Sequence, residues 1–188
     1  AGTLDTQRGG VGVRPPLSKE LVGTLLKNQW EVHPDPRQHQ RRSIYVFARR
    51  NLRYPIFELF DRPDGNASCA RRSQSTTAPQ SLFLLNSRFS LQTARQFAGT
   101  GLSQTSDPSQ FVQWVFKRAL ARSATAAESE RAIQFMEQQR KLAQKAGRPA
   151  GRLALPIPVS ADLDPYQATA YTDLCLAVFN LNEFIYVD

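Results

Sequence analysis

The sequence predicts a mainly α-helical, irregular fold with long loops and at most a minor β element. Apolar residues recur at helical spacing in several segments, and most of these segments begin at a capping residue or an early proline. The 188 residues, of which 41% are hydrophobic and 21% charged, suit a globular protein with a sizeable core. We expect an irregular, glycine-rich arm over residues 1–16 and a single helical domain over residues 17–188.

The first half of the chain contains short elements separated by turns. Ser18 is placed to cap a helix whose apolar positions continue to a prolyl turn at residues 33–36. Residues 43–48 are β-branched and aromatic, which predicts a strand or an extended segment without an obvious partner. Pro55 lies in the first turn of a short helix that should end in the turn cluster of residues 61–66.

The second half predicts longer helices. Thr77 can cap a helix, and a weak point at residues 86–87 indicates either two helices or one helix with a bend. Asp107, followed by proline, starts a helix with a strongly apolar face. A capping box formed by Thr125 and Glu128 opens the next helix, and these two helices should form a hairpin.

A loop and one further helix complete the predicted organisation. Residues 146–163 contain several Gly and Pro and lack periodicity, so we expect a long surface loop. Asp164 and Pro165 then begin the last helix, whose apolar residues are spaced to face a core. No apolar run reaches the roughly eighteen residues that a membrane span needs, which excludes a bilayer-spanning segment.

Positive charge is concentrated in one segment. The chain has 24 Lys and Arg residues against 16 acids, a net +8, and residues 37–72 alone contain nine arginines and three acids, a net +6. Guanidinium groups are planar donors suited to carboxylate, sulfate or phosphate. The candidates for anion or ligand binding are Arg42, Arg49, Arg50, Arg53, Arg71 and Arg72.

Two interpretations of this segment stay open. In the first, internal acids and helix carbonyls satisfy the arginines, which then organise an irregular structure. In the second, several arginines converge unpaired on an open pocket that holds an acidic ligand. Nucleic acid is not favoured, because the aromatic residues of the segment are spaced like core residues and no nucleic-acid-binding signature accompanies them.

Three oxygen-bearing side chains in the turn cluster form a weak calcium candidate. Asp61, Asp64 and Asn66 lie within six residues, and Gly65 permits a sharp turn between them. The stretch lacks the alternating acids and the final glutamate of an EF-hand loop. Turn-stabilising hydrogen bonds are therefore the default interpretation, and the sequence predicts no other metal site.

The two cysteines, Cys69 and Cys175, belong to neither a CxxC nor a CxxCH motif. This spacing excludes a zinc knuckle and a site of covalent haem attachment, so we expect no cofactor in this chain. Two interpretations are left: structural cysteines, or one disulfide between the two, which an exported protein would allow.

Six stretches of the chain point together to a known family. They are RSIY at 42–45, RRNLRYP at 49–55, NASC at 66–69, TTAPQ at 76–80, TDLC at 172–175 and NLNEFIYVD at 180–188. With these motifs the chain resembles the C-terminal domain of unknown function found in large planctomycetal proteins that also contain a cytochrome-c-like domain. The resemblance runs from about Pro15 to Asp188 and is weakest between Ala98 and Tyr166.

The resemblance implies the C-terminal part of a longer, exported and periplasmic protein that binds haem c elsewhere in its chain. It implies the upstream domains as partners, and an acidic carbohydrate, such as a sulfated or carboxylated sugar, as a candidate ligand. It also favours the disulfide between Cys69 and Cys175. The family has no established activity, so no catalytic residue is implied. We expect a structural or site-supporting domain, with an enzymatic or binding domain as the alternative.

Overall fold

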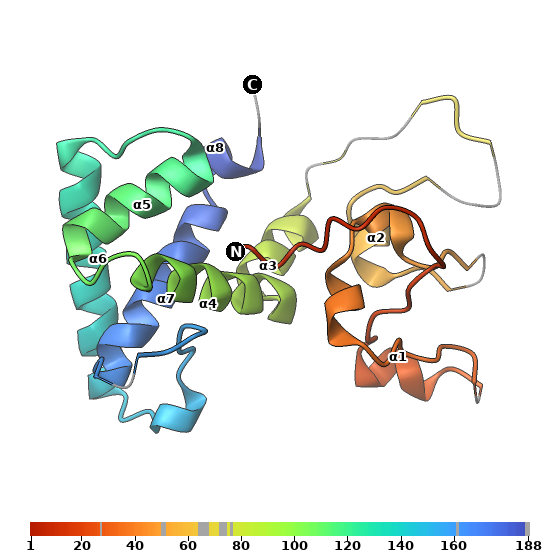
Figure 1. Ribbon diagram of the computed structural model, residues 1–188, viewed down its shortest axis with the longest axis horizontal. Helices are drawn as coiled ribbons and strands as arrows, with labels where there is room; N and C mark the ends of the chain where they lie inside the picture. Colours follow the sequence, from red (N-terminus) through yellow and green to blue (C-terminus); the bar gives the residue numbers. More distant parts are fainter. Residues whose placement is uncertain are drawn as a thin grey trace. The chain divides into compact units, whose positions relative to one another are not determined.

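The protein is mainly α-helical, as the sequence predicts. Its described residues form eight α-helices, three short 3-10 helices and isolated β-bridges, and they contain no sheet (Figure 1). The computed structural model describes the whole chain except residues 27, 50–51, 64–67, 72–74, 76, 161 and 187–188.

The chain divides into two compact units. Unit 1 contains residues 1–2 and 81–188, and unit 2 contains residues 3–80. The two units differ in net charge. Unit 2 has thirteen Lys and Arg residues and seven acids, a net +6, whereas unit 1 has eleven Lys and Arg residues and nine acids, a net +2. The single domain expected from residue 17 onward stays a prediction, and the two units are described separately below.

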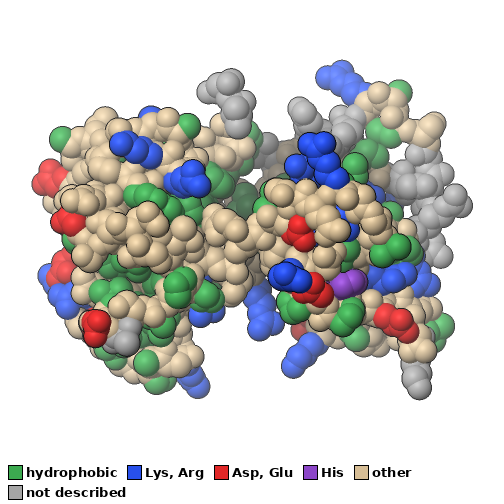
Figure 2. Space-filling model, viewed as in Figure 1, with side chains coloured by type: hydrophobic (Ala, Val, Ile, Leu, Met, Phe, Trp, Pro, Cys, Tyr) green, Lys and Arg blue, Asp and Glu red, His purple; other side chains and the backbone are tan. Residues whose placement is uncertain are grey.

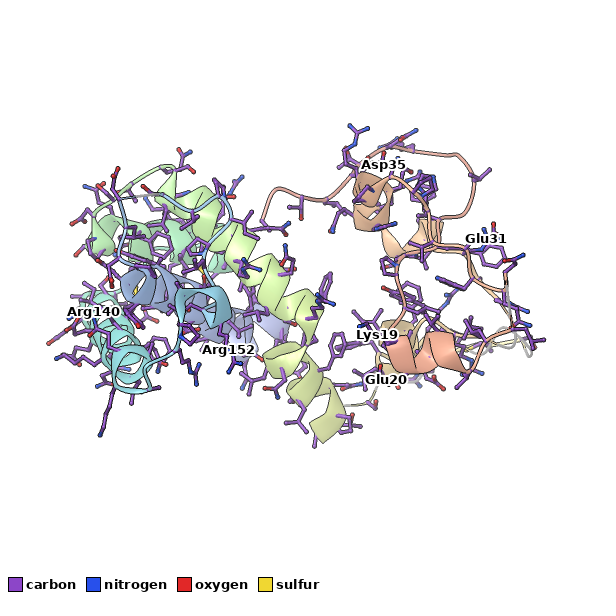
Figure 3. The ribbon with its side chains drawn as sticks, turned by 90° about the horizontal axis from the view of Figure 1, so that it is seen from below. Lys19, Glu20, Glu31, Asp35, Arg140 and Arg152 are labelled. Atoms are coloured by element: carbon purple, nitrogen blue, oxygen red, sulfur yellow. The ribbon has the colours of Figure 1, made fainter. Side chains whose placement is uncertain are left out.

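Unit 2 is built from short elements. Lys19 and Glu20 are the first residues of its first helix (Figure 3). Asp35 caps the following 3-10 helix, because its carboxylate accepts a hydrogen bond from the Arg37 amide at 2.9 Å. The short helix expected at Pro55 is confirmed. The elements are α1 (Lys19–Gly23), η1 (Pro36–Gln40), η2 (Ser43–Tyr45) and α2 (Pro55–Leu59).

The helix after Ser18 is shorter than predicted. α1 ends at Gly23, and the Thr24 hydroxyl donates to the Leu21 carbonyl at 2.8 Å, which competes with continuation of the helix. Of the apolar side chains that suggested a longer helix, Val22 keeps 51% and Leu26 keeps 75% of its accessible surface, whereas Trp30 is buried. The exposed positions Val22 and Leu26 therefore give the predicted helix no continuous buried face.

The strand or extended segment expected at residues 43–48 is wrong for residues 43–45, whereas Val46 is extended. Residues 43–45 form the 3-10 turn η2, and only Val46 pairs, in an isolated parallel bridge with Val13. The Val13 amide donates to the Tyr45 carbonyl and the Phe47 amide donates to the Val13 carbonyl, both at 2.8 Å. A single residue of the arm replaces the partner strand that the segment lacks.

The arm of residues 1–16 has no regular element, but it is packed. Val13 keeps only 2% of its accessible surface. Three successive arm carbonyls accept hydrogen bonds: Arg14 from the His33 amide, Pro15 from the Trp30 indole and Pro16 from the Tyr54 hydroxyl. From residue 3 onward the arm is therefore an integral part of unit 2.

Unit 1 contains the long helices. The predicted weak point at residues 86–87 separates two helices, and side-chain caps at Ser87, Asp107, Thr125 and Asp164 begin four of them. α7 makes its main contacts with α4 and α6, and α5 packs against α6 as a hairpin (Figure 1). The elements are α3 (Ala78–Asn86), whose first three residues belong to unit 2, α4 (Arg88–Leu102), α5 (Pro108–Leu120), α6 (Ala126–Lys145), η3 (Ala150–Arg152), α7 (Pro165–Phe179) and α8 (Asn182–Ile185).

The core of unit 1 lies between α4, α5, α6 and α7. Phe111, Val112 and Val115 of α5 are completely buried. Burying a side chain of this size contributes about 1.5–3 kcal/mol. The facing part of α4 contributes the small, completely buried residues Ala94 and Ala98, which allow neighbouring helices to approach closely.

α8 is an element that sequence reasoning missed. Arg122 holds it: Nε and Nη2 donate to the Glu183 carboxylate at 2.6 and 2.8 Å, and the same guanidinium donates to Glu128 at 2.8 and 2.9 Å. These bonds lower the pKa of Glu128 to about 2 and also lower the pKa of Glu183. The capping box of α6 and the C-terminal helix therefore share one arginine.

The segment of residues 146–163 is a loop, as predicted, but not only a surface loop. Leu153 is 9% exposed, and Pro156 is among the fully buried side chains. The Ile157 amide donates to the Arg95 carbonyl at 2.9 Å, and Arg95 Nε donates to the Leu155 carbonyl at 2.6 Å. The loop is thereby fixed along α4.

Gly99 of α4 is the point of closest approach to this loop. A Cβ built at Gly99 would lie 2.2 Å from the carbonyl carbon and oxygen of Ile157, which are backbone atoms. Gly99→Ala should lower the free energy of unfolding of unit 1 by about 2–3 kcal/mol, even though Ala favours helices. Gly151→Ala is the control, because a Cβ at Gly151 has no neighbour within 4 Å.

The chain has one tryptophan in each unit, Trp30 and Trp114, so ¹⁹F NMR of 5-fluorotryptophan in a urea titration reports the two units separately. Equal midpoints for the Trp114 signal in Gly99→Ala and in the parent chain would contradict the close approach of α4 and the loop.

Asp173 of α7 gives unit 1 a pH dependence. Burial raises the pKa of this partly buried carboxyl to about 6, against a smaller opposing attraction from Arg148. The folded state thus holds the proton more tightly than the unfolded state, and the resulting stability is lost as the pH rises from about 4 to 6. Near pH 4 the free energy of unfolding of Asp173→Asn should equal that of the parent chain. Above pH 7 it should be larger than that of the parent chain, by about 2–3 kcal/mol at most.

Urea unfolding at several pH values, followed at Trp114, measures this difference. Asp162→Asn is the control, because that carboxylate is exposed. If Asp173→Asn is more stable than the parent chain by the same free energy at pH 4 and at pH 8, the Asp173 carboxyl does not titrate in this way.

Candidate functional site

Four aromatic rings form a continuous row in unit 2, within the arginine-rich part of the chain. Trp30 lies edge-on to Phe47 with ring centroids 6.3 Å apart, and it stacks on Tyr54 at 6.4 Å. Tyr54 in turn lies 5.5 Å from Phe57. Trp30 is 9% exposed, and burial raises the pKa of Tyr54. Trp30 is therefore the buried ring of the row, whereas Phe47, Tyr54 and Phe57 are half-buried.

An arginine lies over each end of this row. The Arg14 guanidinium is 4.1 Å from the centroid of Phe47, and the Arg62 guanidinium is 5.0 Å from the centroid of Phe57. A guanidinium over a ring face is attracted by the ring quadrupole, by about 0.5–1 kcal/mol at exposed sites. The two arginines therefore pack against the end rings of the row, and this contact does not neutralise their charge.

The described candidate arginines of the sequence analysis differ in their surroundings. Arg49 Nη1 donates to the carbonyl of Gln29, the residue before Trp30, at 2.9 Å. Arg53 is exposed, and its side chain is not without an interaction partner. Arg42 and Arg71 are exposed. Arg50 and Arg72 lie outside the described residues. In Figure 2 basic side chains (blue) are scattered over the visible face of unit 2.

Arg41 is the most deeply placed cation of this segment. It keeps 7% of its accessible surface, and its guanidinium lies 4.0 Å from the centroid of the Tyr45 ring. Nη2 donates to the carbonyls of Gln7, at 3.2 Å, and of Gly9. Sequence reasoning noted Arg41 only as part of a cluster, because its partners are main-chain groups more than thirty residues away.

Asp61 and Gln80 close the loop that contains Cys69 and Arg71. The Asp61 carboxylate accepts hydrogen bonds from the amide and the hydroxyl of Ser75, both at 2.7 Å. The Gln80 side chain, 8% exposed, donates to the Leu59 carbonyl at 2.9 Å and to the Ser75 hydroxyl at 3.1 Å. Its own oxygen accepts from the Thr77 amide at 3.1 Å.

Gln80 is a residue that sequence reasoning missed. A signal was present, because Thr77 followed three residues later by Gln80 is the spacing of a capping box. Here the glutamine serves that cap and also fixes the end of α2. The TTAPQ motif at 76–80 thus has a structural reason.

The calcium candidate stays a prediction. Asp61 adopts a left-handed conformation, with φ of 55°, and its carboxylate serves Ser75 as a turn-stabilising acceptor. Asp64 and Asn66 lie outside the described residues. Within the part of the chain that is described, no group of three His, Cys, Asp or Glu side chains has the arrangement of a metal site.

The predicted disulfide is absent, because both cysteines are free thiols. Cys69 is exposed in unit 2, where its thiol contacts the Arg71 carbonyl at 3.1 Å. Cys175 is completely buried among the core residues of unit 1, and burial raises the pKa of its thiol. Both thiols are therefore unbridged, and a structural role of the two cysteines stays a prediction.

The fold and the site define a mainly α-helical protein in which arginines and aromatic rings organise unit 2. Residues 1–136 match the family described as PSD1, protein of unknown function (DUF1553). The match covers more than half of the chain, and the chain therefore belongs to this family. Neither a curated protein nor a solved structure matches the chain. In the described residues no helix is long and apolar enough to cross a bilayer.

Gln80→Leu tests the role of this side chain. The substitution keeps the size of the side chain but leaves the Leu59 carbonyl and the Thr77 amide without their partner. An unsatisfied buried polar group costs about 1–3 kcal/mol, so unit 2 should lose about that much stability. The Trp30 signal in ¹⁹F-detected urea unfolding measures it.

Gln138→Leu on the exposed face of α6 is the matched control and should leave the Trp30 midpoint unchanged. If Gln80→Leu and Gln138→Leu behave alike at Trp30, the Gln80 hydrogen bonds do not hold unit 2 together.

Proposed function

We propose that this chain is a non-catalytic helical domain that supports the structure of a larger exported protein, in which a cytochrome-c-like domain binds haem c. The observation that carries the proposal is the internal use of arginines. Arg14 and Arg62 lie on aromatic rings, and Arg41 and Arg49 donate to main-chain carbonyls. Side chains committed to packing in this way organise a structure rather than act on a substrate.

The haem linkage and the export are supported by the sequence motifs. The stretches at 42–45, 49–55 and 180–188 resemble the C-terminal domain of the planctomycetal proteins that contain cytochrome-c-like domains. Two of these motifs contain residues that hold the fold: Arg49 binds the Gln29 carbonyl, and Glu183 binds Arg122. A motif maintained by such contacts fits a supporting role.

A specific observation favours a second candidate function, the binding of an acidic ligand. Arg42 and Arg71 are exposed, and unit 2 has a net charge of +6. A positive surface attracts anions such as sulfated or carboxylated sugars. In this alternative the exposed arginines bind the ligand.

Two matched variants separate these functions. Arg49→Ala removes the donor to the Gln29 carbonyl and should lower the stability of unit 2 by about 1–2 kcal/mol. Arg42→Ala changes an exposed side chain and should stay within about 0.5 kcal/mol of the parent chain. Urea unfolding followed at Trp30 measures both. Equal stability of the two variants would remove the observation on which the proposal rests.

The full-length protein then tests the supporting role. Haem reduction is measured spectroscopically against a panel of neutral and acidic sugars in the parent protein and in both variants. A supporting domain leaves the rate per folded molecule unchanged in Arg42→Ala, whereas a selective loss with acidic sugars would favour ligand binding. The isolated chain should show no Soret band, and covalent haem bound to it would contradict the proposal.

A further inference from the structure

Arg41 has an unused donor in a buried position. Among the residues that the structure describes, its Nε atom has no hydrogen-bond partner, although the side chain is more than nine-tenths buried. A guanidinium presents Nε and Nη2 along one of the two edges that can bind two oxygens at once. Here Nη2 donates hydrogen bonds to the carbonyls of Gln7 and Gly9, whereas the neighbouring Nε donates to no described residue. The edge is therefore only half used.

Arg122 shows what the same edge does with an oxyanion. Its Nε and Nη2 donate to the two carboxylate oxygens of Glu183 at 2.6 and 2.8 Å. Charge-assisted pairs of this kind are about twice as strong as hydrogen bonds between neutral groups, and a carbonyl compensates less of the guanidinium charge. A buried cation satisfied by neutral carbonyls alone is thus in a position where an anion would be favoured.

The chain that covers this edge is a flap, which we define as residues 6–12. Both of its ends are fixed by main-chain hydrogen bonds: the Asp5 amide donates to the Gln40 carbonyl at 3.0 Å, and the Val13 amide donates to the Tyr45 carbonyl at 2.8 Å. All residues of the flap are exposed. Gly9 and Gly10 in its middle have φ of 74° and 92°, a region that glycine adopts without strain.

The flap is attached to the rest of unit 2 by few contacts. In its middle, the Gly9 amide donates to the Tyr45 hydroxyl at 3.1 Å, and the carbonyls of Gln7 and Gly9 accept from Arg41. A segment with exposed backbone, two glycines and fixed ends can open locally at a low free-energy cost. Opening would expose the Nε and Nη2 edge of Arg41 together with the Tyr45 ring.

We propose that Arg41 is an oxyanion-binding site covered by this flap, and that a carboxylate, sulfate or phosphate group replaces the Gly9 carbonyl and takes both Nε and Nη2. The face of Tyr45, 4.0 Å from the guanidinium, holds the cation in place during the exchange. The net charge of +6 on unit 2 attracts the anion. This site does not depend on the proposed supporting function, because a structural domain can bind an anion.

NMR of the arginine side chains tests the proposal. The chain is titrated with sulfate, phosphate or glucuronate, each against chloride at the same ionic strength, and the Arg41 Nε–H resonance is followed together with the Gly9 and Gly10 amides. We expect a saturable shift of all three signals with the oxyanions and none with chloride. Glucuronate binds as a carboxylate and inorganic sulfate as a tetrahedral ion, so comparing them identifies the preferred chemistry.

Arg41→Lys and Arg42→Lys form a matched pair. Lysine keeps the charge but lacks the Nε and Nη2 edge, so Arg41→Lys should weaken sulfate binding by about tenfold or more. The neighbouring Arg42 is exposed, and Arg42→Lys should bind sulfate as the parent chain does. If Arg41→Lys does not fold, the Arg41 Nε–H response of the parent chain decides.

The proposal is overturned if the Arg41 Nε–H signal does not respond to any oxyanion, if Arg41→Lys binds as well as the parent chain, or if Arg42→Lys alone removes binding. These outcomes are independent of the stability and haem measurements that test the supporting role, because they are read from one guanidinium and two flap amides.

Discussion

Unit 2 depends on side chains that satisfy main-chain polar groups. Its described residues form only short helices and isolated bridges, so many backbone groups have no partner within a regular element. Long side chains take this place: Arg41 and Arg49 donate to carbonyls, and so do the Trp30 indole and the Tyr54 hydroxyl. A donor at the end of a long side chain bonds well only if the side chain is fixed. The aromatic row fixes the Trp30 indole and the Tyr54 hydroxyl, and the Tyr45 ring lies against the Arg41 guanidinium, so aromatic rings hold three of these donors in place.

This dependence explains why the unit uses arginine rather than lysine. A flat guanidinium can lie on a ring and still direct N–H groups at carbonyls in its own plane, whereas an ammonium is a strongly hydrated point charge. Arg41 combines both contacts, with Tyr45 beneath it and the Gln7 carbonyl at its edge. Much of the positive charge of unit 2 is therefore a consequence of how the unit is built.

The two units differ in how much of them the sequence could predict. The long helices of unit 1 begin at caps such as Asp107, Thr125 and Asp164, where the side chain and its backbone partner are three residues apart. In unit 2 the deciding contacts join distant residues, such as Gly9 with Tyr45 and Arg41 with Gln7, and a main-chain carbonyl has no sequence signature. Composition thus located the arginines of the candidate site but not their partners. α8 was missed for a related reason, since four residues have no periodicity and their anchor, Arg122, is sixty-one residues away.

The two interpretations of the arginine segment, structural network and anion site, are not exclusive. In unit 1 Arg122 meets two carboxylates, and its charge is compensated within the fold. In unit 2 Arg41 and Arg49 are satisfied by neutral carbonyls, and Arg14 and Arg62 by aromatic rings. A carbonyl accepts a hydrogen bond from the guanidinium and a ring covers its face, but neither neutralises its positive charge. At physiological salt this charge attracts anions within a Debye length of about 8 Å. An arginine can therefore hold the fold and attract an anion at the same time, so the identity of its partner, rather than the presence of one, decides whether it can also take part in binding.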